Sequence, residues 1–353
     1  MKLIHCADIH LDSALGTHLP PDKAAARRSE MLQTFAAMAA YAKENEVRAV
    51  IIAGDLFDVS RVTRKAAAFV LDTVRNYPQI DFYLLRGNHD GGHQAFEGMN
   101  LPENLHLFSS EFKVFSLENV RIGGAEDLSA PDLYNTVDFP KEPFNIAVFH
   151  GAQGTSAGED QVCLPRLQNK NIDYLALGHY HTYTCKKLDQ RGIWAYSGCL
   201  EGRGFDECGS KGMIVLDTDR RSVQFVSLAR RTLHEVEADI TGCVTTREVE
   251  AAVLSAVDNL PAEDLVRVIL TGHYEVETEK DLSYLTQQLR SRFYFAEVYD
   301  ESRLAIDPAA YRNDVSLKGE FVRMVLASRM PQEEKERVLT CGIRALLGEG
   351  VQL

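Results

Sequence analysis

Residues 47–58 read VRAVIIAGDLFD, and they set the pattern for the N-terminal part of the chain. Residues 47–53 form an almost continuous run of apolar and β-branched side chains, which is typical of a strand buried on both faces of a sheet. Gly54 ends the run, and two carboxylates, Asp55 and Asp58, follow it. The stretch therefore predicts a buried strand with acidic side chains at its carboxyl end.

The same pattern, an apolar run followed by a short polar cluster, occurs five times between residues 1 and 181. In open α/β sheets, ligands bind at the carboxyl ends of the strands, so we expect the five clusters to converge on one place. The clusters are Asp8-Ile9-His10, Gly54-Asp55-Leu56-Phe57-Asp58, Gly87-Asn88-His89-Asp90, His150-Gly151 and Gly178-His179-Tyr180-His181.

These clusters hold seven side chains of the kinds that bind metal ions. They include no thiolate, which argues against a structural zinc or an iron–sulfur cluster. Seven ligands are too many for one tetrahedral ion and suit two cations about 3.5–4 Å apart, with Asp55 as a carboxylate that can bridge them. Strand alternation would turn Asp8 and His10 to one face, whereas His179 and His181 would share a face by the same spacing or through a loop. The seven are Asp8, His10, Asp55, Asn88, His150, His179 and His181.

Each cluster taken alone also has an ordinary structural explanation. Asp-x-His pairs occur by chance, and Gly-Asp-x-x-Asp is often a turn that closes a strand. Gly-Asn-His-Asp suits a left-handed turn, and Gly-His-x-His could be a surface loop. The ordered set of five, each after an apolar run, is not explained in this way and favours the metal site.

The composition describes a folded and acidic chain. The sequence has 353 residues, 45% of them hydrophobic, which excludes a wholly disordered protein and suggests two domains. Its formal net charge is −13, of which residues 1–230 carry −5 and residues 231–353 carry −8. A negative field opposes the binding of nucleic acid, but two divalent cations in the expected site would offset most of the −5.

Cysteine usage and hydropathy predict a cytoplasmic protein without membrane contact. The seven cysteines form no Cys-x-x-Cys pair, so a disulfide framework is not expected. The beginning of the chain contains Asp8 and lacks the apolar core of a signal peptide, and no run of about 18 uncharged apolar residues would cross a membrane.

The sequence pattern changes after Arg230. Residues 231–306 read as strands alternating with helices, and we expect them to form a small α/β cap domain beside a catalytic domain of residues 1–230. Residues 307–353 are expected to be a helical segment that docks a partner. The apolar side chains of its last helix are Val338, Ile343, Leu346 and Leu347.

A helix expected over residues 24–44 raises the question of a homodimer. Four apolar residues are spaced so that they share one face of this helix. The face could form the seam of a homodimer or pack on the domain's own sheet, and the sequence supports both equally. The four residues are Met31, Phe35, Met38 and Ala39.

The five clusters, in this order, resemble the calcineurin-like metallophosphoesterases. Residues 1–12, 54–58, 173–181 and 196–212 further resemble the DNA repair exonuclease branch, which includes the SbcD nuclease subunit and YhaO-like proteins. The segment 196–212, YSGCLEGRGFDECGSKG, discriminates best because phosphatases of the superfamily do not share it. The resemblance is strong over residues 1–230 and weaker beyond them.

This resemblance implies a fold of two stacked mixed β-sheets flanked by helices, with a small C-terminal α/β cap. It implies that Asp8, His10, Asp55 and His181 hold one ion and that Asp55, Asn88, His150 and His179 hold the other. Manganese is the usual metal of the family, while the donor set also suits magnesium, iron or zinc. Members of this branch work on DNA with an SMC-like ATPase that has a long coiled coil.

The favoured function is a two-metal-dependent DNA exonuclease or endonuclease acting in DNA repair. His89 is the candidate that stabilises developing charge or protonates the leaving oxygen, and Asp58 is expected to orient His89 unless it is a turn carboxylate. Arg203 is a candidate phosphate contact, with a solvated surface charge as the alternative. A phosphomonoesterase or cyclic-nucleotide phosphodiesterase, and a non-catalytic scaffold, remain as competing functions.

Overall fold

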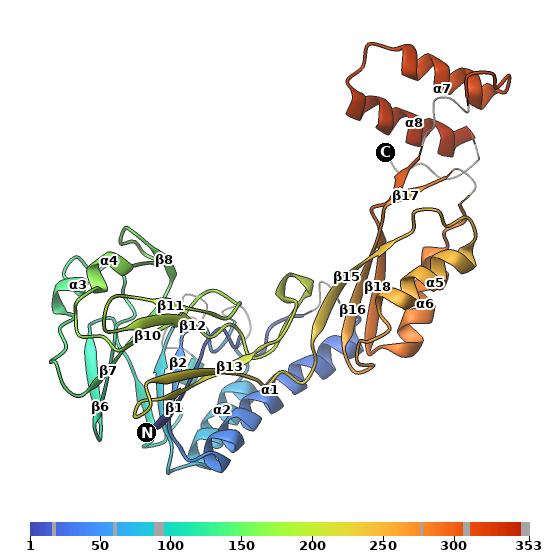
Figure 1. The fold of residues 1–353 in the computed structure, drawn as a ribbon. Coiled ribbons are helices and arrows are strands. Elements are labelled where there is room, and N and C mark those ends of the chain that lie inside the picture. Colours follow the sequence, from blue (N-terminus) through green and yellow to red (C-terminus); the bar gives the residue numbers. More distant parts are fainter. Residues whose placement is uncertain (16–18, 59–61, 88–94, 276–277, 306–310, 347–353) are drawn as a thin grey trace. The chain divides into compact units, whose positions relative to one another are not determined.

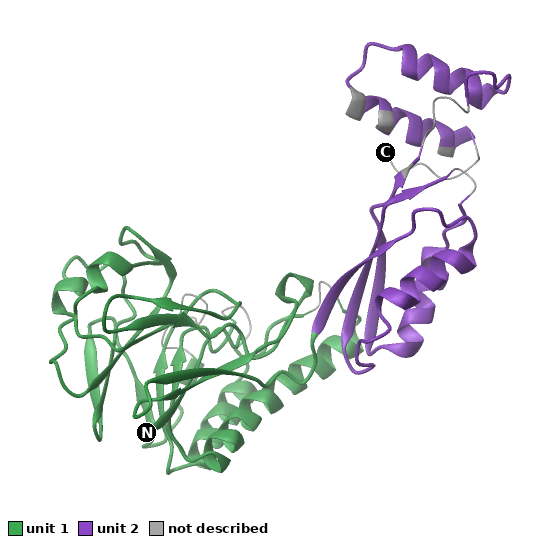
Figure 2. Ribbon diagram, in the orientation of Figure 1, with its two compact units in different colours: residues 1–232 green, residues 233–353 purple. Residues whose placement is uncertain are grey.

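The computed structural model describes residues 1–15, 19–58, 62–87, 95–275, 278–305 and 311–346 (Figure 1). The chain forms two compact units, Met1–Thr232 and Leu233–Leu353 (Figure 2). The boundary between these units lies two residues beyond Arg230, where the sequence pattern changes. A separate C-terminal part beginning at residue 307 remains a prediction.

The first unit is built on two six-stranded mixed sheets. In the first sheet, the parallel strands β1 to β4 are extended by the antiparallel strands β13 and β14, in the order β14-β13-β1-β2-β3-β4. Its strands are β1 (Lys2–Cys6), β2 (Val47–Ala53), β3 (Asp81–Leu85), β4 (Leu105–Leu107), β13 (Gly212–Asp217) and β14 (Ser222–Ser227). The second sheet has the order β11-β12-β10-β7-β6-β5, with antiparallel strands only at its two edges. Its strands are β5 (Lys113–Leu117), β6 (Val120–Gly124), β7 (Phe144–His150), β10 (Tyr174–Gly178), β11 (Thr184–Lys187) and β12 (Ile193–Tyr196).

The two sheets pack face to face around a shared hydrophobic core. Ile51 of β2 belongs to the same buried cluster as Val148 of β7 and Ala176 of β10. Because side chains alternate along a strand, each sheet has a second apolar face that must also be covered. Helices α1 (Pro21–Glu44) and α2 (Arg64–Arg75) lie against the first sheet (Figure 1). The short elements are β8 (Ala152–Gly154), β9 (Gln161–Cys163), α3 (Leu133–Thr136), α4 (Leu164–Leu167) and a 3₁₀ turn, Phe205–Glu207. The predicted fold class is confirmed.

Helix α1 packs on its own domain and does not offer the homodimer seam considered above. Its four apolar residues, Met31, Phe35, Met38 and Ala39, are all buried within the chain. The seam interpretation was therefore wrong for this face, since the face already covers β2. Although α1 has 24 residues, neither it nor any other described helix is long and apolar enough to span a membrane.

The second unit begins with a small parallel sheet. Its strands have the order β15-β16-β18, and the helices α5 and α6 contribute Val249, Val253, Leu285 and Leu289 to the core of this sheet. This arrangement confirms the α/β cap of the predicted fold class. The elements are β15 (Leu233–Asp239), α5 (Thr246–Ala256), β16 (Leu265–Thr271), β17 (His273–Tyr274), α6 (Leu282–Arg292), β18 (Phe295–Asp300) and β19 (Arg303–Leu304).

Helices α7 (Leu317–Ala327) and α8 (Gln332–Leu346) form a pair with a small core of their own. Val338 and Ile343, expected to dock a partner, pack in this core against Val322 and Val325 of α7 instead. Leu346 is exposed, and Leu347 lies outside the described residues. The expected docking face of the last helix is therefore largely used within the pair.

Candidate metal centre

Four of the five polar clusters lie where a strand ends. These strands are β1 and β2, which are neighbours in the first sheet, and β7 and β10, which are neighbours in the second. The fifth cluster follows β3, but Asn88, His89 and Asp90 lie outside the described residues. The stacking of the two sheets brings the four described clusters together, as the following distances show.

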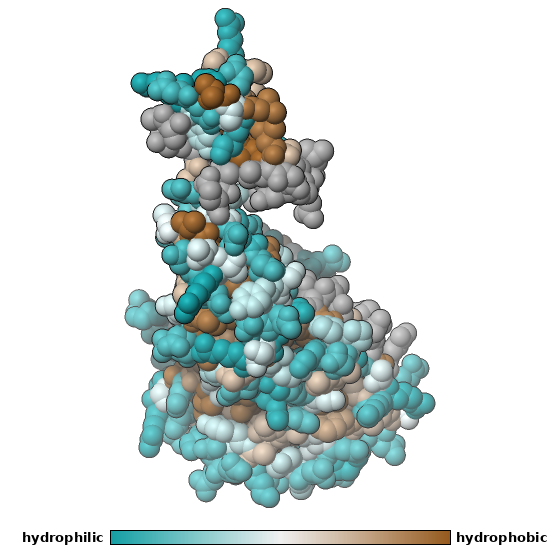
Figure 3. All heavy atoms as spheres, turned by 90° about the vertical axis from the view of Figure 1, so that its right-hand side faces the viewer, coloured by the Kyte–Doolittle hydropathy of each residue, from teal (hydrophilic) through white to brown (hydrophobic). Residues whose placement is uncertain are grey.

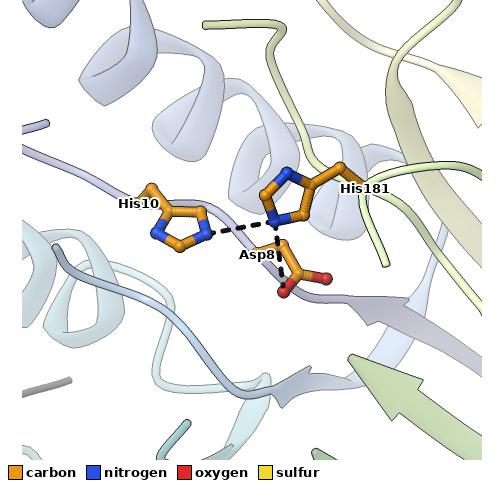
Figure 4. A group of neighbouring side chains, drawn as sticks. All are labelled: Asp8, His10 and His181. Carbon is orange, nitrogen blue, oxygen red and sulfur yellow. Dashed lines mark hydrogen bonds and ion pairs between the residues drawn. The ribbon is translucent and has the colours of Figure 1, made fainter. Parts of the chain in front are cut away.

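The first group of side chains consists of Asp8, His10 and His181, which point toward one another (Figure 4). The Nε2 atom of His181 lies 3.4 Å from Nε2 of His10 and 3.9 Å from Oδ1 of Asp8. Asp8 and His10 are buried, and His181 is partly exposed. Two imidazole nitrogens and one carboxylate oxygen thus face the same small volume.

The second group consists of Asp8, Asp55 and His150, all three buried. Nδ1 of His150 donates a hydrogen bond of 2.9 Å to the carbonyl oxygen of Ala53, which leaves Nε2 as the atom that faces Asp55. Oδ2 of Asp55 lies 3.3 Å from this Nε2 and 3.7 Å from Nε2 of His10. Asp55, a member of the second group, therefore also approaches His10 of the first group, as a bridging carboxylate would.

His179 adjoins both groups. Its backbone N–H donates to the two carboxylate oxygens of Asp8 at 2.9 and 3.0 Å, and its ring meets the ring of His150 edge-on with the centroids 5.6 Å apart. Of the seven predicted ligands, the structure brings these six together, and the seventh, Asn88, lies outside the described residues.

Turns, rather than strand alternation, aim these side chains. Strand β1 ends at Cys6, before Asp8 and His10, so the expectation that strand alternation aligns this pair was wrong. Asp8, His10 and Asp55 have φ values of 50°, 46° and 53°, and His179 has a φ of 112°. A positive φ is unfavourable for a side chain with a Cβ and costs of order 1–3 kcal/mol, and such strain concentrates at functional sites.

Two glycines of the polar clusters lie so close to predicted ligand side chains that no Cβ would fit at their positions. A Cβ on Gly54 would lie 2.1 Å from Nδ1 of His150, and a Cβ on Gly87 would lie 2.1 Å from Oδ1 of Asp55. Both separations are far below van der Waals contact. The close approach of the loops therefore requires glycine at these two positions.

This geometry agrees with a comparison of the chain with known protein families. Residues 1–183 match the family described as calcineurin-like phosphoesterase. The chain belongs to this family. Membership makes it a metal-dependent phosphoester hydrolase by class, and the two groups of side chains are candidates to hold its divalent ions.

Several relatives of this phosphoesterase support the predicted resemblance to the DNA repair branch. Metallophosphoesterase YhaO of Bacillus subtilis is 29% identical over 245 residues, which cover 64% of this chain and 59% of YhaO. DNA double-strand break repair protein Mre11 of Methanopyrus kandleri is 24% identical over 252 residues, which cover 62% of this chain and 54% of that protein. Mre11 of Sulfolobus acidocaldarius is 21% identical over 330 residues, covering 87% and 84%. The chain thus spans less than two thirds of the length of the first two.

The donor set of this phosphoesterase fits a divalent cation. Burial raises the pKa of Asp8 to about 6. Burial also opposes protonation of His150, but the Asp55 and Asp8 carboxylates outweigh it and raise the pKa of His150 to about 9. Buried carboxylates thus attract compensating positive charge, which a bound cation supplies in place of protons. Carboxylate and imidazole ligands suit manganese, iron or zinc.

Glu207 is a residue of the site that the sequence reasoning missed. Its carboxylate Oε1 lies 2.7 Å from Nδ1 of His181, and it is buried. Arg203, expected to contact phosphate, directs its guanidinium to Glu207, with Nη2 at 2.6 Å and Nε at 3.1 Å from Oε1. Glu207 lies inside the discriminating segment 196–212, but no pattern in the sequence pairs it with His181.

Asp58 interacts electrostatically with Arg203, the residue that holds Glu207. It is partly buried, and its charge acts on the guanidinium of Arg203. Its expected partner, His89, lies outside the described residues, so the role of Asp58 in orienting His89 stays a prediction.

Proposed function

We propose that this phosphoesterase is a two-metal-dependent DNA nuclease, exonucleolytic or endonucleolytic, that uses Mn²⁺. The observation that carries the proposal is the pair of ligand groups that share Asp8 and are joined through Asp55. Two such ions would hold a phosphodiester between them, polarise it and lower the pKa of the attacking water. An arrangement of this kind suits phosphoester hydrolysis better than a single structural ion.

We assign the residues of the chain to metal binding and to catalysis as follows. Asp8, His10, Asp55 and His181 would hold one ion, and Asp55, Asn88, His150 and His179 the other. His89 would protonate the leaving oxygen or stabilise the charge that develops on the phosphate, and Asp58 would orient His89. Buried neighbours and the turn-imposed backbone geometry keep the described ligands in place before the substrate arrives.

Two observations and one electrostatic argument support DNA as the substrate. Relatives matched over much of the chain are named as DNA double-strand break repair proteins. The segment 196–212, which resembles the nuclease branch, is built directly against the ligand His181 through Glu207. Bound cations would also neutralise much of the negative charge that otherwise repels a polyanion.

The proposal includes an SMC-like coiled-coil ATPase as partner, as the family resemblance implies. On the second unit, hydrophobic side chains gather on the helical pair (Figure 3). Val315, Leu317 and Met324 are 99%, 73% and 64% exposed. Leu317 and Met324 are seven residues apart on α7 and so lie on one helix face, which is the spacing at which a partner helix packs. This face replaces the one expected on the last helix.

A nuclease assay with three substrates tests the function. The protein is stripped with a chelator, reloaded with Mn²⁺ and given end-labelled linear duplex DNA, bis(p-nitrophenyl) phosphate or p-nitrophenyl phosphate. Metal-dependent shortening of the DNA supports the proposal. Activity on the small esters alone would replace it with a phosphatase or small phosphodiesterase. Absence of bound Mn²⁺ together with inactivity on all three would indicate a scaffold.

A further inference from the structure

We infer that Glu207, held by Arg203, is a positioning residue that selects the ring tautomer of His181 and so aims Nε2 at the ion held by the first group. The inference rests on the metal-binding part of the proposed function. It assigns a task to the segment 196–212, which the ligand set alone leaves unexplained.

The first step of the argument concerns the proton on His181. A carboxylate can only accept, so the 2.7 Å contact between Nδ1 and Oε1 of Glu207 places the ring proton on Nδ1. The lone pair of the neutral ring then lies on Nε2, the atom 3.4 Å from Nε2 of His10 and 3.9 Å from Oδ1 of Asp8. Nη2 of Arg203 also lies 3.2 Å from Nδ1, but two donors cannot bond each other, so this is only a contact.

The second step concerns what fixes the carboxylate itself. The Nη2 and Nε atoms of Arg203 both donate to Oε1 of Glu207, and the backbone N–H of Arg203 donates to Oε2 at 2.8 Å. Glu207 is buried, so these bonds are not weakened by competition with water. Arg203 therefore holds the orientation of the carboxylate, and the carboxylate holds the orientation of the imidazole.

The third step concerns the anchoring of the loop that carries both residues. Arg27 of α1 donates to Oε2 of Glu201 at 2.7 Å and to the carbonyl of Gly202 at 3.0 Å. On the other side of Glu207, the buried Lys211 donates from Nζ to the carbonyl oxygen of His181 at 2.9 Å. The backbone of His181 and the loop that orients its ring are thus tied to the same rigid frame.

The test measures Mn²⁺ binding by calorimetry on the full chain, with E207Q as the variant. Glutamine keeps the shape but can donate as well as accept, so it no longer selects one tautomer. We expect one of the two Mn²⁺ sites to weaken by about 10- to 100-fold, the usual effect of losing a partner of a metal ligand. Asp206→Asn is the matched control, since it removes the same charge from the neighbouring, exposed residue, and both sites should stay unchanged.

Two further measurements separate positioning from a general loss of structure. Nitrogen-15 spectra of the imidazoles should show His181 with its proton on Nδ1 in the wild type and a mixture of tautomers in E207Q. In a His10→Ala background, E207Q should have little further effect on Mn²⁺ binding, whereas in a His150→Ala background its effect should persist. Wild-type affinity at both sites with an unchanged tautomer in E207Q would overturn the inference.

If E207Q does not fold, Arg203→Met provides the same test, because it leaves Glu207 in place and releases its orientation. Weaker binding at one site supports the inference, and unchanged affinity of a folded Arg203→Met protein contradicts it. None of these measurements uses DNA. Failure of the wild type to cut DNA would therefore overturn the proposed nuclease function without touching this inference.

Discussion

The Nε2 atom of His150 lies 3.3 Å from Oδ2 of Asp55, although the two residues are 95 positions apart in the chain and Asp55 follows a strand of the first sheet whereas His150 ends a strand of the second. The same oxygen lies 3.7 Å from Nε2 of His10. The Asp55 carboxylate is thus close to a histidine of each ligand group, and we expect its substitution to weaken metal binding by both groups.

Asp55→Asn should abolish tight binding of Mn²⁺ at both sites. The neutral amide removes the charge that would be shared by two cations, so the loss at each site should exceed the about 10- to 100-fold that follows removal of a ligand's partner. Calorimetric titration of the chelator-treated protein measures this, with Asp132→Asn, an exposed carboxylate, as the control. Retention of one site at full affinity would show that Asp55 serves one ion only.

Gly54→Ala should destabilise the first unit through a clash with His150. Gly54 has a φ of 95°, and the added Cβ would lie 2.1 Å from Nδ1 of that histidine. Gly98→Ala is the matched control, because Gly98 has a φ of 70° with open space around it. In both variants alanine must adopt a positive φ, which lowers the free energy of unfolding. The clash should lower it by about 1–3 kcal/mol more in Gly54→Ala. Urea unfolding followed by Trp194, the single tryptophan, measures the difference; equal losses would contradict it.

The stability contributed by Glu30 should depend on pH. Burial would raise the pKa of Glu30, but hydrogen bonds from Arg231 and Arg27 outweigh burial and lower it. The unfolded chain therefore binds the proton more readily, so this stabilisation is complete above the ordinary pKa of about 4.3 and is lost as the pH falls through the lowered value.

Glu30→Gln should accordingly cost about 1–3 kcal/mol of unfolding free energy at pH 7, because it leaves buried donors without their charged acceptor. The difference from the wild type should shrink when the pH is lowered below about 4. Urea unfolding at several pH values gives the comparison, with the exposed Glu44→Gln on the same helix as control. A difference that does not change with pH would mean that the carboxylate charge is irrelevant.

His89→Asn should keep both Mn²⁺ sites and lose DNA cleavage. A proton donor or charge stabiliser contributes about 10²- to 10⁴-fold to the rate, and asparagine supplies no titratable proton. Calorimetry and the end-labelled DNA assay report binding and cleavage separately, with the exposed His273→Asn as control. Cleavage at the parent rate would remove His89 from the proposed mechanism.

The sequence by itself identified the family and the sheet-and-helix class and predicted a set of ligand residues, because each depends on local pattern. A β-branched run such as residues 47–53 specifies a buried strand wherever it occurs, and polar residues after a run must lie at a strand end. The order of the five clusters then limits the chemistry to carboxylate, amide and imidazole donors.

Tertiary structure alone decided three other features. The apolar face of α1 has the same spacing whether it meets a sheet or a second copy, and only the position of β2 shows that the sheet buries Met31 and Phe35. The turns at Asp8 and His10 depend on the backbone bonds that Gly54 and Asp55 accept from the neighbouring loop. Glu207 and His181 are 26 residues apart, so no local pattern pairs them. Their meeting depends on long-range packing, which spacing along the chain does not encode.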